Sequence, residues 1–145
     1  MALDKKPVTL DYALRTAKDY YPKDKYDHAI RVMQYIADNE MIPPEYREDC
    51  LVLAVMHDLL EDTEYQVCYE IEDDGFIDTL NLLTKPKDMD YIEYIKRIRD
   101  TKYTMYWRMC AWWVKLADMK DHLSQTETLT EKLRDKYLTA LPYLL

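Results

Sequence analysis

The hydrophobic and polar pattern of the chain is helical almost throughout, with caps and prolines between the periodic stretches. Thr9 caps a first predicted helix that runs to about Tyr20, and Pro22 with Asp24 begins a second one that runs through Ala37. Further helices are predicted at about residues 43–60, 76–83, 88–100, 104–123 and 129–141. No stretch of useful length alternates with the two-residue period of a strand, so we expect an all-α protein.

Two punctuation signals refine this pattern around the middle of the chain. Pro43 and Pro44 suit the first turn of the third helix, which is predicted to reach Leu60. Thr63, followed by Gln66 three residues later, predicts a capping box for a short helix that Gly75 ends or links. The 145 residues contain no repeat or long linker, so we expect one domain over residues 1–145.

The composition excludes several kinds of active site. The chain has one glycine, whereas a dinucleotide-binding fingerprint, a phosphate-binding P-loop and a nucleophile elbow each need two or more. The single serine, Ser124, has no glycine nearby to build a strained turn, which argues against serine hydrolysis. A site in this protein is therefore expected to consist of side chains on helices.

Charge is distributed unevenly along the chain. The formal net charge is −8, but residues 36–79 hold 14 acidic residues and one basic residue, a balance of −13. The other 101 residues hold 19 basic and 14 acidic residues, a balance of +5. The overall acidity argues against binding of duplex nucleic acid, which depends on many Lys and Arg contacts to phosphates. A small anionic substrate stays compatible, because basic residues gather in residues 84–108.

The chain carries no signal for export or membrane insertion. Its first ten residues, MALDKKPVTL, lack an apolar core, and the longest apolar run, Cys50 to Met56, is far shorter than a membrane span. The three cysteines are widely spaced and form no C-x-x-C pair, which is typical of free thiols in a reducing compartment. We expect a cytoplasmic protein with no membrane partner.

The third predicted helix ends in a cluster of ionisable residues. Residues 51–56 are apolar on every side of the helix, which predicts burial, and His57, Asp58, Glu61 and Asp62 follow them within one arc of the helical wheel. Carboxylates that lose their hydration at the end of a core helix repel one another unless a cation or hydrogen bonds compensate. A bound metal ion is the simplest compensation.

Two other helices repeat this anomaly. His28 lies on the apolar stripe of the second helix. In the helix predicted at 104–123, an apolar run leads directly into Asp118, with Asp121 and His122 one turn later. Imidazole and carboxylate donors from three helices form a mixed nitrogen and oxygen set. Such a set suits Mn, Fe, Co, Ni or Zn better than the all-oxygen site typical of Ca or Mg.

The order His28, His57-Asp58, Asp118 resembles the H…HD…D signature of the HD-domain phosphohydrolase superfamily. The blocks LAVMHDLLEDT (53–63), LLTK (82–85) and VKLADMKDHL (114–123) resemble those of the RelA/SpoT-type (p)ppGpp hydrolases and their small stand-alone relatives. The resemblance spans about residues 24–124. It implies a single helical HD domain that removes pyrophosphate from the 3′ position of a guanosine nucleotide.

The same resemblance implies roles for individual residues. The divalent metal, most often Mn²⁺ in the family, is expected to be held by His28, His57, Asp58 and Asp118. Glu61 and Asp62 match the Glu-Asp pair that orients or activates the attacking water. The residues expected to contact the anionic nucleotide are Lys25, Lys85, Arg108 and His122.

Two departures from the family leave the substrate open. The segment before the first histidine, YYPKDKYDH (20–28), lacks the glycine of its relatives and offers Lys23 and Lys25 instead, and His122 stands where relatives commonly have asparagine. One alternative is an HD-type hydrolase of a 5′-monophosphate, a deoxynucleotide or NADPH. Another is a non-enzymatic helical protein that binds a partner, such as an antitoxin with its toxin. A homo-oligomer also stays open.

Overall fold

The computed structural model describes residues 8–145 and is all-α, as predicted, with no strand in that part of the chain. Its helices are α1 (Leu10–Tyr20), α2 (Lys23–Asp38), α3 (Pro44–Met56), α4 (Leu59–Asp62), α5 (Asp74–Leu82), α6 (Tyr91–Thr101), α7 (Tyr106–Ser124) and α8 (Glu131–Leu144). The predicted cap of α1 is confirmed, because the side chain of Thr9 accepts a hydrogen bond from the Tyr12 amide. None of these helices is long and apolar enough to span a membrane.

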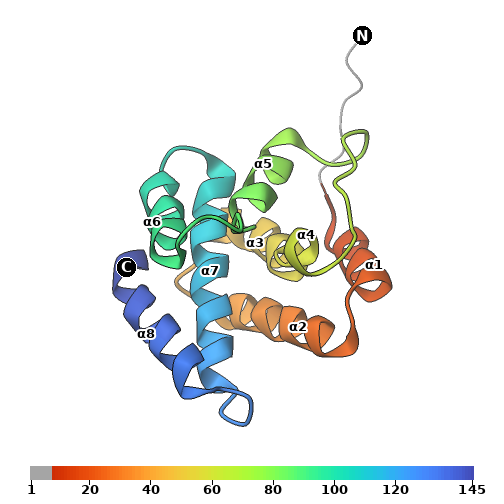
Figure 1. Ribbon diagram of the computed structural model, residues 1–145. Coiled ribbons are helices and arrows are strands. Elements are labelled where there is room, and N and C mark those ends of the chain that lie inside the picture. Colours follow the sequence, from red (N-terminus) through yellow and green to blue (C-terminus); the bar gives the residue numbers. More distant parts are fainter. Residues whose placement is uncertain (1–7) are drawn as a thin grey trace.

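Helix α7 runs through the middle of the molecule, with α6 and α8 on one side and α1 to α4 on the other (Figure 1). It packs against α2, α3, α5, α6 and α8. Helix α3 packs against α1, α2 and α7, and residues 52–56 of α3 are fully buried. The prediction that this apolar stretch lies in the core is confirmed. The polar residues at its end are therefore held against α2 and α7.

The prediction that the third helix continues to Leu60 is wrong, because α3 ends at Met56 and α4 begins at Leu59. In an unbroken helix the amide of Asp58 would donate to the carbonyl of Ala54. Instead, the Ala54 carbonyl accepts from His57 Nδ1 at 2.6 Å, and the Asp58 amide donates to the hydroxyl of Tyr21 at 3.1 Å. Side chains thus replace the helical bonds, and the backbone leaves the helical conformation at Asp58, directly after His57.

The predicted capping box at Thr63 is also wrong, since residues 63–73 form no helix. The Thr63 hydroxyl donates to the Leu59 carbonyl and accepts from the Tyr65 amide, which closes α4. The segment that follows is held by Glu72, which is fully buried and accepts hydrogen bonds from the Tyr65 hydroxyl and the Cys68 amide. These tertiary partners outweigh the local capping signal.

Gly75 does not end or link a preceding helix. It lies in the first turn of α5, whose N-cap Asp73 accepts from the Phe76 amide. A Cβ atom at position 75 would lie 2.8 Å from Cδ1 of Trp107 on α7. The glycine is therefore explained by the close approach of α5 to α7.

Candidate metal centre

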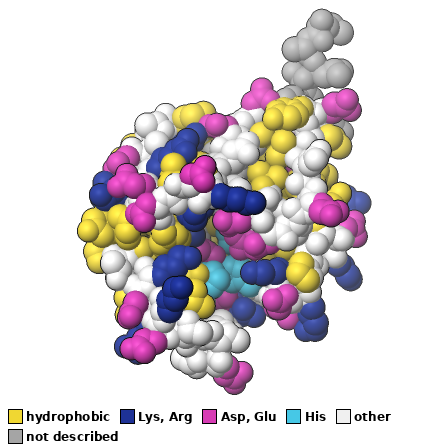
Figure 2. Space-filling model, in the orientation of Figure 1, with side chains coloured by type: hydrophobic (Ala, Val, Ile, Leu, Met, Phe, Trp, Pro, Cys, Tyr) yellow, Lys and Arg dark blue, Asp and Glu magenta, His cyan; other side chains and the backbone are white. Residues whose placement is uncertain are grey.

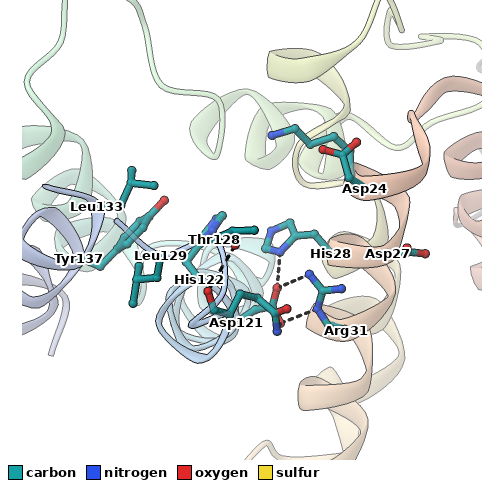
Figure 3. Close-up of a pocket in the computed structure, with 12 residues that line it drawn as sticks. Asp24, Asp27, His28, Arg31, Asp121, His122, Thr128, Leu129, Leu133 and Tyr137 are labelled. Atoms are coloured by element: carbon teal, nitrogen blue, oxygen red, sulfur yellow. Dashed lines mark hydrogen bonds and ion pairs between the residues drawn. The ribbon is translucent and has the colours of Figure 1, made fainter. Parts of the chain in front are cut away.

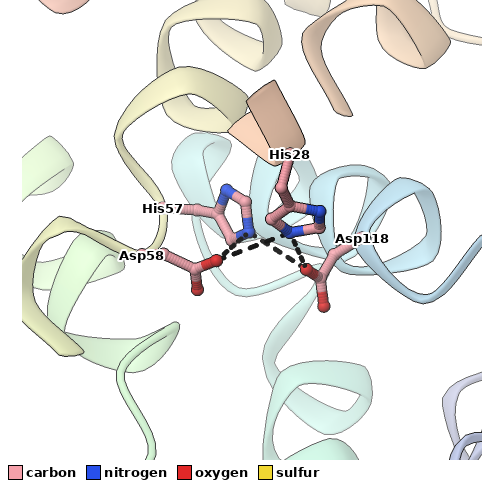
Figure 4. A group of neighbouring side chains, drawn as sticks. All are labelled: His28, His57, Asp58 and Asp118. Carbon is pink, nitrogen blue, oxygen red and sulfur yellow. Dashed lines mark hydrogen bonds and ion pairs between the residues drawn. The ribbon is translucent and has the colours of Figure 1, made fainter. Parts of the chain in front are cut away.

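Four side chains from three parts of the fold converge beside α7 (Figure 4). His28 comes from α2, His57 and Asp58 from the break after α3, and Asp118 from α7. One ligand atom from each lies within 4.8 Å of all the others. We call these four residues the metal-binding group, because they could hold a metal ion. The structure brings together all four ligands expected from the sequence.

The closest distances in this group join imidazole nitrogens to carboxylate oxygens. Asp118 Oδ1 lies 2.9 Å from His28 Nε2 and 3.1 Å from His57 Nε2. Asp58 Oδ2 lies 3.1 Å from His57 Nε2 and 3.5 Å from His28 Nε2. Donor atoms at neighbouring positions around one ion, each about 2.1 Å from it, lie roughly 3 Å apart. The spacing of the group therefore fits a shared divalent ion.

The other ring nitrogen of each histidine has its own acceptor. His57 Nδ1 donates to the Ala54 carbonyl at 2.6 Å, and His28 Nδ1 donates to Asp121 Oδ2 at 2.6 Å. A carbonyl can only accept, so Nδ1 of His57 carries a proton, and an ionised Asp121 imposes the same on His28. Both Nε2 atoms then face the centre as the nitrogens available for a metal.

Without an ion, the carboxylates control the charge of both histidines. Burial alone lowers the pKa of His28, but hydrogen bonds to Asp118 and Asp58 outweigh it and raise that pKa to about 9. The pKa of His57 is likewise raised, against the effect of burial, by Asp58 and Asp118. Burial raises the pKa of Asp58, but His57 and His28 bring it well below its ordinary value. A bound metal would take the place of these protons.

The second oxygen of Asp118 is occupied by a buried lysine. Lys115 Nζ lies 2.9 Å from Asp118 Oδ2, and both residues are almost completely buried. Burial lowers the pKa of Lys115, but Asp118 and the neighbouring tyrosines raise it well above its ordinary value. Sequence reasoning missed this residue, although it is the sole charged side chain between Arg108 and Asp118 in an otherwise apolar stretch. A lone lysine within an apolar helical stretch indicates a buried charge that needs a partner, and this signal could have identified Lys115.

A cavity of about 160 Å³ opens beside the metal-binding group. We call it the lysine pocket; its lining residues are Lys25, Asp58, Glu61, Asp62, Lys85, Tyr91, Tyr94, Lys115, Asp118, His122, Lys136 and Tyr137. The structure thus brings five of the other six predicted site residues to one cavity. In Figure 2 the histidine surface lies at the floor of a hollow, with Lys, Arg and acidic side chains around it.

Glu61 and Asp62 line the side of this pocket that is formed by α4. Partial desolvation and the charge of Asp58 raise the pKa of both carboxyl groups above their ordinary values. Asp62 lies 3.7 Å from Lys25 Nζ, whereas no ion pair is found for Glu61 among the described residues. Lys85 Nζ donates to the carbonyls of Pro86 and Met89 at 3.0 and 2.9 Å, which orders the loop before α6.

His122, which is predicted to contact the substrate, also lies directly against the metal-binding group. Its Nε2 is 3.3 Å from Asp118 Oδ1, and its ring stacks on Tyr137 of α8 with centroids 4.8 Å apart. Arg108 is the one predicted site residue that lies elsewhere. It is ten residues before Asp118 on α7, about 15 Å along the axis, and its guanidinium pairs with Asp78 of α5 at 2.5 Å.

A second cavity, of about 330 Å³, lies on the other side of His28 and His122, between α2 and α8 (Figure 3). Arg31 borders it and donates to both carboxylate oxygens of Asp121, at 2.8 and 3.1 Å. Burial raises the pKa of Asp121, but Arg31 and His28 outweigh it and keep the carboxylate ionised. Arg31 and Asp121 therefore form a supporting layer behind the His28 ligand.

The comparisons with known proteins add no family assignment. No family model matches the chain, and the search of curated proteins found no significant match. The function must therefore be argued from the site and from the sequence resemblance.

Proposed function

We propose that the protein is a metal-dependent phosphohydrolase of the HD-domain type that acts on a small nucleotide. The observation that carries the proposal is the metal-binding group, in which two imidazole Nε2 atoms and two carboxylates meet within 4.8 Å. The other polar atoms of His57, His28 and Asp118 are bound by Ala54, Asp121 and Lys115 respectively, which leaves their inward-facing atoms for an ion. An ion pair needs only one histidine and one carboxylate, whereas here two histidine nitrogens and two carboxylates converge on one point.

Acid–base groups and cations next to the centre support phosphoryl chemistry. A divalent ion held by His28, His57, Asp58 and Asp118 would supply positive charge for the phosphoryl oxygens and would make the attacking water more acidic. Glu61 borders the same cavity, has no ion-pair partner among the described residues, and has a raised pKa. In the proposed reaction Glu61 accepts a proton from the attacking water as the water oxygen bonds to phosphorus. The bond from phosphorus to the leaving sugar oxygen breaks, and that oxygen takes up a proton. Lys25 pairs with Asp62, the neighbour of Glu61.

The positive side chains of the lysine pocket fit an anionic substrate. Lys25, Lys85, Lys115 and Lys136 border a cavity that also holds acidic residues. Phosphate groups pair with such lysines and neutralise their mutual repulsion. Among nucleotides, (p)ppGpp is the best candidate, because the sequence blocks around His57 and Asp118 resemble those of the (p)ppGpp hydrolases. The expected products are pyrophosphate and the nucleotide without its 3′ diphosphate.

A substrate screen tests this proposal. The purified protein is incubated with Mn²⁺ and ppGpp, pppGpp, 5′-monophosphates, deoxynucleotides or NADPH, and pyrophosphate and orthophosphate are measured separately. Pyrophosphate from ppGpp supports the proposal. Orthophosphate from monophosphates or NADPH alone would leave the metal chemistry and replace the substrate. Absence of turnover with every nucleotide would contradict a phosphohydrolase and favour the partner-binding alternative.

A further inference from the structure

The wall of the lysine pocket formed by α6 and α8 contains an unsatisfied polar group. The hydroxyl of Tyr91, at the start of α6, is buried and has no hydrogen-bond acceptor among residues 8–145, since the nearby Lys115 ammonium can only donate to its oxygen. Buried hydroxyl groups in folded proteins normally have a partner, and an unpaired one is destabilising. Tyr91 lines the lysine pocket, and its hydroxyl interacts electrostatically with Lys115, Asp118 and Glu61, which line the same pocket. An acceptor for the hydroxyl proton would therefore come from this side.

The ammonium groups beside Tyr91 cannot supply this acceptor. Lys136 Nζ of α8 lies 4.4 Å from the centre of the Tyr91 ring, and Lys115 Nζ of α7 lies 5.6 Å from it. Ammonium groups donate hydrogen bonds and accept none. Lys115 is already bound to Asp118, whereas no ion pair is found for Lys136 in the described part of the chain. This wall therefore presents donors and positive charge, and lacks an acceptor.

We propose that Tyr91 and Lys136 form an anion subsite that binds a phosphate group, with the Tyr91 hydroxyl donating to a phosphate oxygen and Lys136 pairing with its charge. Phosphate oxygens accept hydrogen bonds and carry negative charge, which supplies both of the missing features. The assignment to a phosphate of the substrate rests on the proposed function; the anion subsite itself rests on the geometry of this wall.

The electrostatics of α8 agree with this subsite. Burial and the charge of Lys115 lower the pKa of Lys136, and Lys85 adds to the repulsion. The acidic side chains that face Lys136, Glu61 and Asp118, act in the opposite direction without overcoming this effect. An anion placed between the ammonium groups would relieve their repulsion, so binding is expected to stabilise the protein as well.

The test compares two tyrosine variants by phosphate binding and thermal stability. Inorganic phosphate is titrated into the full chain by calorimetry, once with Mn²⁺ and once in EDTA, and the arm with the tighter parental binding is used. Tyr91→Phe removes a buried hydroxyl whose proton has no acceptor, so its melting temperature should equal or exceed that of the parent. Its dissociation constant for phosphate should rise about tenfold or more, because a hydrogen bond to a charged group is lost.

Tyr65→Phe is the matched control, because the Tyr65 hydroxyl is bonded to buried Glu72 and lies outside the lysine pocket. It should lower the melting temperature and leave phosphate affinity unchanged. Lys136→Gln should weaken phosphate binding about tenfold or more and reduce its dependence on salt. Unchanged affinity in Tyr91→Phe, or a loss of stability together with affinity, would overturn the role of its hydroxyl. The subsite would be overturned if the parent bound phosphate in neither arm.

Neither readout involves turnover, so the subsite and the phosphohydrolase proposal can fail separately. Phosphate binding that depends on Tyr91, without hydrolysis of any nucleotide, would support the subsite and contradict the enzyme. Hydrolysis of a nucleotide, together with unchanged phosphate affinity in Tyr91→Phe and Lys136→Gln, would support the enzyme and contradict the subsite.

Discussion

The two walls of the lysine pocket differ in how completely their polar groups are satisfied. In the metal-binding group, on α2, α7 and the break after α3, the outward-facing atoms of His28, His57 and Asp118 each have a partner. The wall from α6 and α8 has the Lys136 ammonium, which is repelled by Lys115 of α7, and a buried hydroxyl without an acceptor. The first wall is organised by folding alone, whereas the second acquires its missing partners when an anion binds.

The largest effect on metal affinity is expected at Asp118, whose Oδ1 atom lies next to both histidine Nε2 atoms. Asp118→Asn removes the charged oxygen next to both Nε2 atoms, so Mn²⁺ affinity should fall by more than about 100-fold, beyond the loss typical of a supporting residue. It also leaves the Lys115 ammonium buried without its carboxylate, which should lower the free energy of unfolding by about 3–5 kcal/mol.

Electron paramagnetic resonance of free Mn²⁺ and urea unfolding measure these two effects. Asp135→Asn serves as the control, because Asp135 is exposed on α8 and lines neither cavity. Parental Mn²⁺ affinity in Asp118→Asn would show that the metal-binding group is not where the ion binds.

The next effect separates chemistry from metal binding. Glu61→Gln removes the proposed proton acceptor from the lysine pocket and leaves the metal-binding group intact, so turnover should fall about 100- to 10,000-fold. Mn²⁺ affinity should stay within about twofold of the parent. Initial rates on the substrate identified by the screen give the first quantity. Glu64→Gln, an exposed neighbour outside the pocket, should retain full activity, and an equally active Glu61→Gln would remove this residue from the mechanism.

A smaller effect is expected in the layer behind His28. Asp121→Asn replaces the carboxylate that accepts from His28 Nδ1 and binds Arg31, so Mn²⁺ affinity should fall about 10- to 100-fold. Glu72→Gln is a matched control, because Glu72 is equally buried and hydrogen-bonded but lines neither the lysine pocket nor the cavity beside Arg31. It should lower stability and leave Mn²⁺ affinity unchanged. Equal losses of affinity in the two variants would show a general effect on folding.

The smallest effect concerns pH. The pKa of His28 is about 9 without a metal, and a metal requires the neutral Nε2, so binding must displace a proton over most of the physiological range. Apparent Mn²⁺ affinity should therefore rise with pH between about 6.5 and 9, by at most about tenfold per unit for this one proton. Calorimetry in buffers with different ionisation enthalpies measures the proton release. Affinity that falls as pH rises would contradict neutral His28 as a ligand.

Most of the fold and the four metal-binding residues could be predicted because their signals are local. Each helix carries its own apolar period, and His57, Asp58 and Asp118 directly follow apolar runs, where charged groups need compensation. The break after α3 could not be predicted this way. It depends on the hydroxyl of Tyr21, which is 37 residues away in the chain from Asp58. The error at Arg108 has the same origin, since its partner Asp78 lies on another helix.

Local chemistry along the chain thus suffices for the all-α class, most helix positions and a set of candidate metal ligands, because periodicity, caps and misplaced charges act within a few turns. The resemblance to the HD-domain signature selected the four residues of the metal-binding group from that set. The packing of α6 and α8 against α7 determines the rest: which lysines face the metal-binding group, that Arg108 does not, and that Tyr91 lacks an acceptor. These features depend on which side chains from distant segments share one cavity, and such distances exist only once the helices have packed.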